Sequence, residues 1–247
     1  MLGDAMRHEA GKMKFEYGSE TIELTVEHSK RKSFRISVEP PDSVFVLAPV
    51  GTKSDEILKI VKTKAKWIEK KLREIKEAGI EKAHKEYASD ETFMYLGRDC
   101  RLNVQMDESA KKPFAEFADG CFHVRTNAKD ETQLRKAMED WYRKKTLDIV
   151  AERVGFYQKH FVLRPLEIKS KKQRSRWGSC SNAHRLNFNL KCSMAPMEII
   201  DYIVVHEMCH MVHFNHSKEF WDMVEGIIPD YRKRREWLRK NGIRMIL

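Results

Sequence analysis

Alternating apolar and polar residues dominate the first half of the chain, which is the pattern of β-strands that bury one face. Three of the alternating stretches contain a short turn signal, namely Gly18-Ser19, Leu96-Gly97 and Asp119-Gly120, which favours hairpins. The stretches that predict strands are 14–26, 33–38, 44–48, 92–106 and 113–124. This half of the chain is therefore expected to be rich in β-sheet.

Helical periodicity, in which apolar residues recur three and four positions apart, predicts helices in the remaining stretches. One long helix is expected over 57–75 and another over 130–160, each with one apolar side. Three shorter helices are expected near the carboxyl end, and a proline opens the first and the third of them. Two short strands, 166–169 and 185–192, interrupt this helical half.

The order of these elements predicts an α+β fold with two domains. Residues 12–128 are expected to form a β-rich amino-terminal domain with one long helix. Residues 129–247 are expected to form a mostly helical domain with a short β-hairpin or sheet. Residues 1–11 show no period and are expected to be disordered.

Composition narrows the class of protein. Charged residues make up 34% of the 247 residues and hydrophobic residues 41%, which is typical of a soluble globular protein. No apolar run approaches the ~20 residues of a membrane span and no leader is visible, so we expect a cytoplasmic protein without membrane contact. The five cysteines form no C-x-x-C pair, which favours free thiols in a reducing compartment.

The basic character of the chain bears on its partners. A formal net charge of +10 favours an anionic partner, nucleic acid above all, bound through the basic surface. The alternative is a generic basic surface with no specific partner, and charge alone leaves both open.

The strongest chemical signal is the stretch His206-Glu207-Met208-Cys209-His210. Residues four apart on a helix lie on one face, so the two imidazoles can bind one ion. Glu207 lies about 100° further round, beside the ion and within reach of a water bound to it. This is the arrangement of the His-Glu-x-x-His zinc motif, in which the glutamate is the catalytic base.

A catalytic zinc usually has three protein ligands and one water, so the helical histidines need a partner. His216 is the best candidate, because its distance from His210 equals that in the long metzincin pattern. That pattern has a glycine midway, where this chain has His213. The turn is therefore expected at Phe214-Asn215, with the asparagine at positive φ, and His213 is expected behind the ligands or on the surface.

Four closely spaced histidines would also fit a surface that binds metal adventitiously. The residues before His206 argue against this alternative, because a helix this apolar is buried and its imidazoles and carboxylate then need partners. A metal supplies such partners. The apolar residues are Ile199, Ile200, Ile203, Val204 and Val205.

A basic segment, residues 171–181, separates the two short strands. On a loop over the metal, Arg174, Arg176 and Trp177 would bind an anionic group or stabilise a developing oxyanion. An equally weighted alternative makes Trp177 a core anchor. Asn187 lies on the polar face of the second short strand and is grouped with them as a candidate substrate contact, because this strand would pair with an extended substrate.

Taken together, these motifs resemble those of the YgjP-like metallopeptidase domain family, whose members are described as predicted metal-dependent hydrolases. The likeness runs from about Glu27 onward and its separate motifs occur in the same order. The matching stretches are His206-Glu207-x-x-His210, Asn215-His216-Ser217, Phe220-Trp221, Arg176-Trp177-Gly178-Ser179-Cys180-Ser181, Asp201-Tyr202-Ile203-Val204-Val205, Arg31-Lys32-Ser33, Ala48-Pro49, Lys66-Trp67-Ile68 and Tyr95-Leu96-Gly97.

The resemblance implies one Zn²⁺ on His206, His210 and His216, or another divalent metal, with Glu207 catalytic. It also implies a zincin-like metal domain similar to that of SprT-like (Spartan-type) proteases, which act on proteins bound to DNA. The favoured function is a metallopeptidase acting on a peptide or protein. A metal-dependent nucleotide phosphohydrolase (UTP/NTP pyrophosphatase-like) is the first alternative, because such an activity is attributed to the type member. A nucleic-acid-associated protein with a structural metal is the second.

Overall fold

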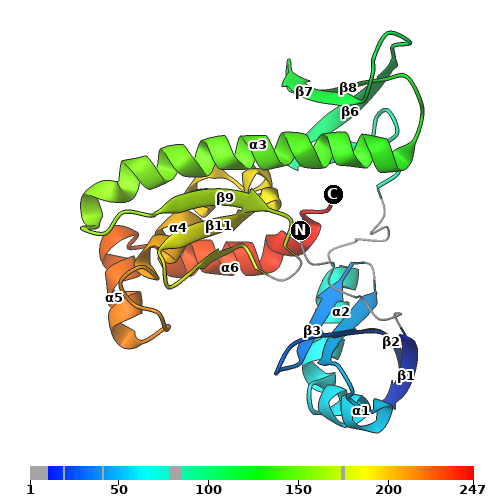
Figure 1. Cartoon of the computed structure of the whole chain (residues 1–247), viewed down its shortest axis with the longest axis vertical. Helices are drawn as coiled ribbons and strands as arrows, with labels where there is room; N and C mark the ends of the chain where they lie inside the picture. The colour runs from blue at the N-terminus through cyan, green and yellow to red at the C-terminus, as the bar shows by residue number, and fades with distance from the viewer. Residues whose placement is uncertain (1–10, 19, 41, 78–84, 174–175) are drawn as a thin grey trace. The chain divides into compact units, whose positions relative to one another are not determined.

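The computed structural model of the chain describes residues 11–18, 20–40, 42–77, 85–173 and 176–247. By its contacts the chain divides into two compact units, Met1–Ala83 and His84–Leu247 (Figure 1). Helices and small mixed sheets make up the structure, which confirms the α+β class. None of the helices in these ranges combines the length and apolar character that a membrane crossing needs. Residues 1–10 of the segment expected to be disordered lie outside the described part, and Gly11 begins a strand.

The first unit contains a four-stranded sheet in the order β1-β2-β4-β3. Its strands are β1 (Gly11–Tyr17), β2 (Glu20–Ser29), β3 (Arg35–Glu39) and β4 (Ser43–Pro49). The antiparallel pair β1–β2 confirms the hairpin expected over 14–26, and the antiparallel pair β3–β4 contains the strands expected over 33–38 and 44–48. The two pairs join through β2 and β4, which run parallel at the centre of the sheet.

The long helix expected over 57–75 is two helices, α1 (Ser54–Thr63) and α2 (Ala65–Glu77). The break is at Lys64, whose φ of −107° and ψ of 4° lie outside helical geometry. The Lys64 N–H donates to the carbonyl three residues back at 2.8 Å, which ends α1 in a tight turn. The buried positions continue at spacings of four and three through the break, so periodicity alone gives no sign of it. These positions are Ile57, Val61, Ala65 and Ile68.

A second four-stranded sheet opens the second unit, in the order β5-β6-β8-β7. Its strands are β5 (Thr92–Tyr95), β6 (Arg98–Met106), β7 (Phe114–Ala118) and β8 (Cys121–Thr126). An aromatic cluster joins this sheet to the long helix α3 (Glu131–Tyr157). In that cluster the Trp141 ring centroid lies 4.9 Å from that of Phe122 and 5.0 Å from that of Tyr95.

This aromatic packing places the division between the units earlier in the chain than the expected boundary after residue 128. The β5–β8 sheet shares one continuous core with α3 and the carboxy-terminal helices, so the contacts divide the chain between Ala83 and His84. Alternation along a strand shows that one face is buried but not which helix buries it. The sequence pattern therefore groups this sheet with the wrong neighbours.

A three-stranded sheet, alongside which α3 runs, has the order β10-β11-β9 (Figure 1). Its strands are β9 (Glu167–Lys171), β10 (Gly178–Cys180) and β11 (Arg185–Asn189). The strand expected over 185–192 is shorter, because Leu190–Met194 form the 3₁₀ helix η2. β11 pairs with β9 on one side and β10 on the other, so it has no free edge for a substrate strand, contrary to expectation. The edge strands are β9 and β10, and β10 lies within the segment expected to be a loop.

Helix α4 (Met197–Cys209) occupies the centre of the second unit and is buried on nearly every side. The remaining elements are η1 (Gln158–His160), α5 (Lys218–Ile227), α6 (Tyr231–Asn241) and η3 (Gly242–Arg244). Arg153 of α3 pairs with Asp201 of α4 through two bonds, Nε to Oδ1 at 2.5 Å and Nη2 to Oδ2 at 3.1 Å. Removing one partner of such a largely buried pair costs on the order of 3–5 kcal/mol, so the pair fixes α4 against α3.

The turn between β5 and β6 holds the start of α4. The N–H groups of Leu96 and Gly97 donate to the carbonyls of Ser193 and Met194, both at 2.9 Å. Gly97 has a φ of +80°, and a Cβ there would lie 2.6 Å from Cγ of Pro196. Glycine is therefore required here both for the backbone conformation and for the close approach to α4.

We expect Gly97→Ala to lower the free energy of unfolding more than Gly120→Ala does. Both glycines have positive φ, at 80° and 78°, so both variants carry a backbone cost of ~1–2 kcal/mol. Only Gly97→Ala also places a methyl group against Pro196, which adds an overpacking cost of ~1–3 kcal/mol. Urea unfolding followed by tryptophan fluorescence measures both values. Equal losses would show that the turn does not bear on α4.

Candidate metal centre

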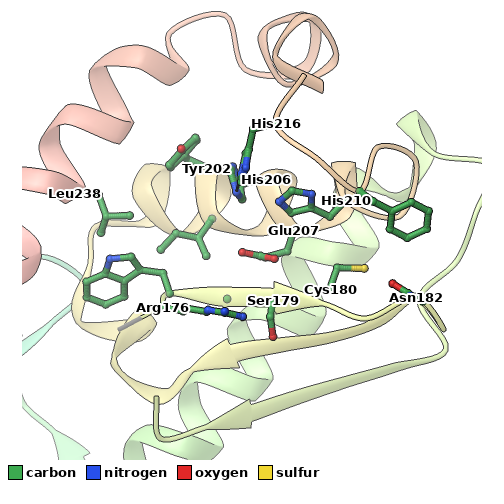
Figure 2. A pocket seen from close by; sticks show the side chains of 14 residues that line it. Arg176, Ser179, Cys180, Asn182, Tyr202, His206, Glu207, His210, His216 and Leu238 are labelled. Atoms are coloured by element: carbon green, nitrogen blue, oxygen red, sulfur yellow. Dashed lines mark hydrogen bonds between the residues drawn. The ribbon is translucent and has the colours of Figure 1, made fainter. Parts of the chain in front are cut away.

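Three histidines converge at the carboxyl end of α4. His206 and Glu207 lie in its last turns and His210 caps it, while His216 approaches from the segment before α5 (Figure 2). One nitrogen of each imidazole lies within 4.8 Å of the other two. Nε2 of His206 and Nε2 of His216 are 3.1 Å apart. The structure thus brings the three histidines named from the sequence to one point.

The hydrogen bond of His210 determines which of its nitrogens faces the other two rings. Its Nδ1 lies 3.0 Å from the carbonyl oxygen of His213. A carbonyl only accepts, so Nδ1 carries the proton and Nε2 keeps its lone pair. This is the tautomer that a metal-binding imidazole needs. His213 contributes its backbone here, and its ring is not in the cluster of ligand atoms.

The turn that carries the chain from His210 to His216 differs from the expected one. Asn215 is not among the residues with positive φ. Instead, the N–H groups of residues 211–213 donate to carbonyls in the last turn of α4 at 2.9–3.0 Å. These bonds continue the right-handed winding past the helix end, so the chain reverses without a left-handed residue.

Burial favours the neutral form of His206 and His216. Burial lowers the pKa of His206 to about 3, and the neighbouring rings of His210 and His216 lower it further by charge repulsion. Burial and His210 also lower the pKa of His216. Neutral imidazoles are the form that binds metal.

Glu207 is buried beside these rings, with 5% of its surface exposed. Burial raises its pKa to about 8, and the nearby positive charge of Arg176 opposes the shift. The edge strand β10 passes directly over it, because a Cβ on Gly178 would lie 2.6 Å from both Cγ and Oε1 of Glu207. Only a glycine at position 178 leaves enough room for the Glu207 side chain under the strand.

The polar groups at this point fit a divalent transition metal. Nε2 of His206 and Nε2 of His216 face each other, and Oε2 of Glu207 is buried beside them with no hydrogen-bond partner in the described part of the chain. Three imidazole donors suit zinc and its neighbours rather than Mg²⁺ or Ca²⁺, which prefer oxygen. A cation at the convergence of the rings would compensate the cost of burying them together.

An open cleft of about 560 Å³ leads to the three histidines. Arg176 and Cys180 line one side of it and Tyr202 and Leu238 another (Figure 2). Arg176 is exposed, and its guanidinium has no ion pair with any residue that the structure describes. Burial, and then the charge of Glu207, raise the pKa of the Cys180 thiol to about 11, so it is a neutral thiol on the cleft wall.

The other residues named from the segment between the strands have different places. Trp177 lines the cleft and also packs on Gly242, where a Cβ would lie 2.7 Å from its ring. Asn187 lies in a separate groove on the polar face of the β9–β11 sheet and not in the metal cleft, because its neighbours in β11 face the core. Arg174 lies outside the described residues.

Among the cleft residues that the sequence does not single out as site candidates, Tyr202 and Cys180 each have a signal in the chain. Tyr202 lies one helical turn before His206, so the spacing 202, 206, 210 already places it on the metal-facing side of α4. Cys180 follows Gly178 by two positions on an extended strand, so both point toward α4. Recognising the second signal required knowing that this segment is a strand.

Similarity to known proteins bears on the identity of this site. No curated protein matches the chain. Among solved structures, the crystal structure of the metallopeptidase zymogen of Pyrococcus abyssi abylysin is 17% identical, covering 42% of this chain and 98% of that chain. Its TM-score of 0.32 is too low to carry a conclusion about fold or function. The profile of the YgjP-like metallopeptidase domain matches residues 32–241, and the chain therefore belongs to this family of metallopeptidases.

Proposed function

We propose that the chain is a zinc-dependent peptidase that cleaves extended peptides or exposed segments of proteins. The observation that carries the proposal is the convergence of three imidazoles beside a buried carboxylate at the end of an open cleft. Family membership supports a metallopeptidase, and the all-imidazole donor set supports zinc. His206, His210 and His216 would be the ligands.

Glu207 is the proposed catalytic base. A divalent cation bound at the three histidines would polarise the scissile carbonyl and lower the pKa of water. With that positive charge beside it, Glu207 would be ionised despite its burial, so it takes the proton of the attacking water and passes it to the leaving nitrogen. Its Oε2 is available for this, because no described residue forms a hydrogen bond with it.

The edge of β10 is the proposed docking site for the substrate backbone. β10 pairs with β11 on one side only, and it borders the cleft through Gly178 and Cys180. An extended peptide added at this edge would form main-chain hydrogen bonds beside the metal. Cleavage would then require an unfolded segment or a loop, since only an extended chain can pair in this way.

Arg176 is the proposed contact for an anionic group of the substrate. It lies two positions before Gly178 and lines the same cleft. A guanidinium without an ion pair among the described residues is available for a carboxylate. Trp177 is proposed as the anchor that holds this part of the cleft wall, because it packs on Gly242.

The nucleotide and nucleic-acid alternatives gain no specific support. The ligand cluster contains no carboxylate, whereas Mg²⁺-dependent nucleotide chemistry uses carboxylate oxygens. The arguments for nucleic acid remain the basic net charge and the resemblance to SprT-like proteases. All five cysteines are free thiols, which supports the expected reducing cytoplasmic compartment.

Removal of metal should abolish peptide hydrolysis and lower the unfolding temperature, and added Zn²⁺ should restore both. Binding to the folded state alone stabilises it by ~2.7 kcal/mol at a metal concentration 100 times Kd. Differential scanning calorimetry with and without a chelator, alongside casein and nucleotide hydrolysis assays, measures this. The control is His206→Ala, whose unfolding temperature should not respond to zinc. Casein hydrolysis by metal-free protein, or hydrolysis of nucleotides alone, would contradict the proposal.

Glu207→Gln should leave the bound metal in place and lower kcat by ~10²–10⁴-fold, because it removes the proton acceptor and none of the ligands. Metal content by atomic emission and kcat on an unstructured peptide are the two measurements. Glu152→Gln on the exposed side of α3 is the matched control and should behave as the parent. Full activity of Glu207→Gln would exclude it as the base.

Arg176→Gln should raise KM by ~10-fold or more for peptides with Asp or Glu near the scissile bond and leave neutral peptides little changed. A charge-assisted hydrogen bond contributes ~1.5–3 kcal/mol, which sets this magnitude. Arg185→Gln, on the opposite face of the sheet, is the control. An equal fall in kcat for both peptide classes would instead assign Arg176 to the developing oxyanion.

A further inference from the structure

The third histidine of the cluster lacks the support that the other two have. His206 and His210 are held by α4, and the proton on Nδ1 of His210 is fixed by a backbone carbonyl. His216 lies outside any helix or strand and is exposed. Among the described residues, the hydrogen-bond contact of its ring is with Nε2 of His206, across the space that a metal would fill. Something other than backbone structure must therefore orient its ring.

An aromatic stack reaches His216 from α5 and α6. The His216 ring stacks on Trp221, with centroids 5.5 Å apart and planes 23° apart. Trp221 in turn stacks on Tyr231, at 5.2 Å and 15°. Tyr231 is buried, with 4% of its surface exposed, and the Arg235 guanidinium lies 4.9 Å from the Trp221 ring centroid. Trp221 is thus itself fixed from the next helix.

Phe220, the residue before Trp221, contacts all three imidazoles. It is fully buried and stacks on His210 with centroids 4.5 Å apart. It meets His206 and His216 edge-on at 5.0 Å and 4.9 Å. Phe220 and Trp221, two successive residues of α5, therefore pack against the histidine cluster. Trp221 stacks on His216, which is the histidine that lies outside any helix or strand.

We propose that Trp221 is a positioning residue for metal binding, which holds the imidazole of His216 by stacking and so completes the site. The proposal rests on the metal centre of the proposed function. A ligand on an irregular segment loses conformational freedom when it binds, and a stack that orders it beforehand reduces that cost. Groups that orient metal ligands typically account for ~10–100-fold in metal affinity.

The test compares Trp221→Leu, which keeps an apolar side chain but removes the ring, with Trp221→Phe, which keeps a ring that can stack. Zn²⁺ affinity is measured by competition with a chromophoric chelator. Trp221→Leu should bind ~10–100-fold more weakly, and Trp221→Phe should recover most of the loss. Trp67→Ala, an exposed tryptophan of the first unit, should bind as the parent does. Unfolding temperatures of the metal-free proteins establish that each variant is folded.

Two further measurements test whether Trp221 affects metal binding through the His216 ring. The visible spectrum of the Co²⁺-substituted protein should change in Trp221→Leu and remain like the parent in Trp221→Phe. In a His216→Ala background, Trp221→Leu should cause a much smaller additional loss of affinity, because most of its effect acts through that ring. The remaining contact of Trp221 with the cluster is with the His206 ring, which lies 5.8 Å away and is tilted rather than stacked. Additive losses would overturn the proposal, as would parent-like affinity of Trp221→Leu. Failure of the parent itself to bind any divalent metal would instead remove the proposed function.

Discussion

The second unit depends on α4, a helix that is almost fully buried yet ends in two imidazoles and a carboxylate. Desolvation at this point is costly for each polar group, and it shifts the pKa of His206 downward and that of Glu207 upward. Neither Nδ1 of His206 nor Oε2 of Glu207 finds a hydrogen-bond partner among the described residues. The neighbouring structure serves to fix this helix while leaving its polar end facing a cleft.

Four elements from distant parts of the chain meet α4, each through a specific close contact. Arg153 of α3 pairs with Asp201, and the β5–β6 turn bonds to the chain just before the helix start. β10 crosses over Glu207 at a glycine, and Phe220 of α5 lies against the three rings. The packing thus fixes the position and rotation of the helix, which determine where its imidazoles point.

The three histidines are not held in place in the same way. Two are carried by α4, whose geometry alone brings residues four apart to one face. The third is carried by an exposed segment and by stacking from α5. A site built in this way would couple metal binding to the docking of the carboxy-terminal helices, because Tyr231 of α6 stacks on the tryptophan that stacks on His216. The metallopeptidase family to which the chain belongs is consistent with such a centre.

The local sequence pattern by itself determined the α+β class, most helices and strands, and the three histidines that converge on one point. It could do so because the periods of two and 3.6 residues and the His-Glu-x-x-His spacing are short-range properties of the chain. Tertiary structure alone decided which helix covers the β5–β8 sheet, and so where the units divide. It also decided that β10 is the edge strand beside the metal cleft, that Asn187 faces away from this cleft, and that Trp221 stacks on His216. These features arise from the way that strands, helices and the irregular segments between them pack in space, and periodicity along the chain carries no information about that packing.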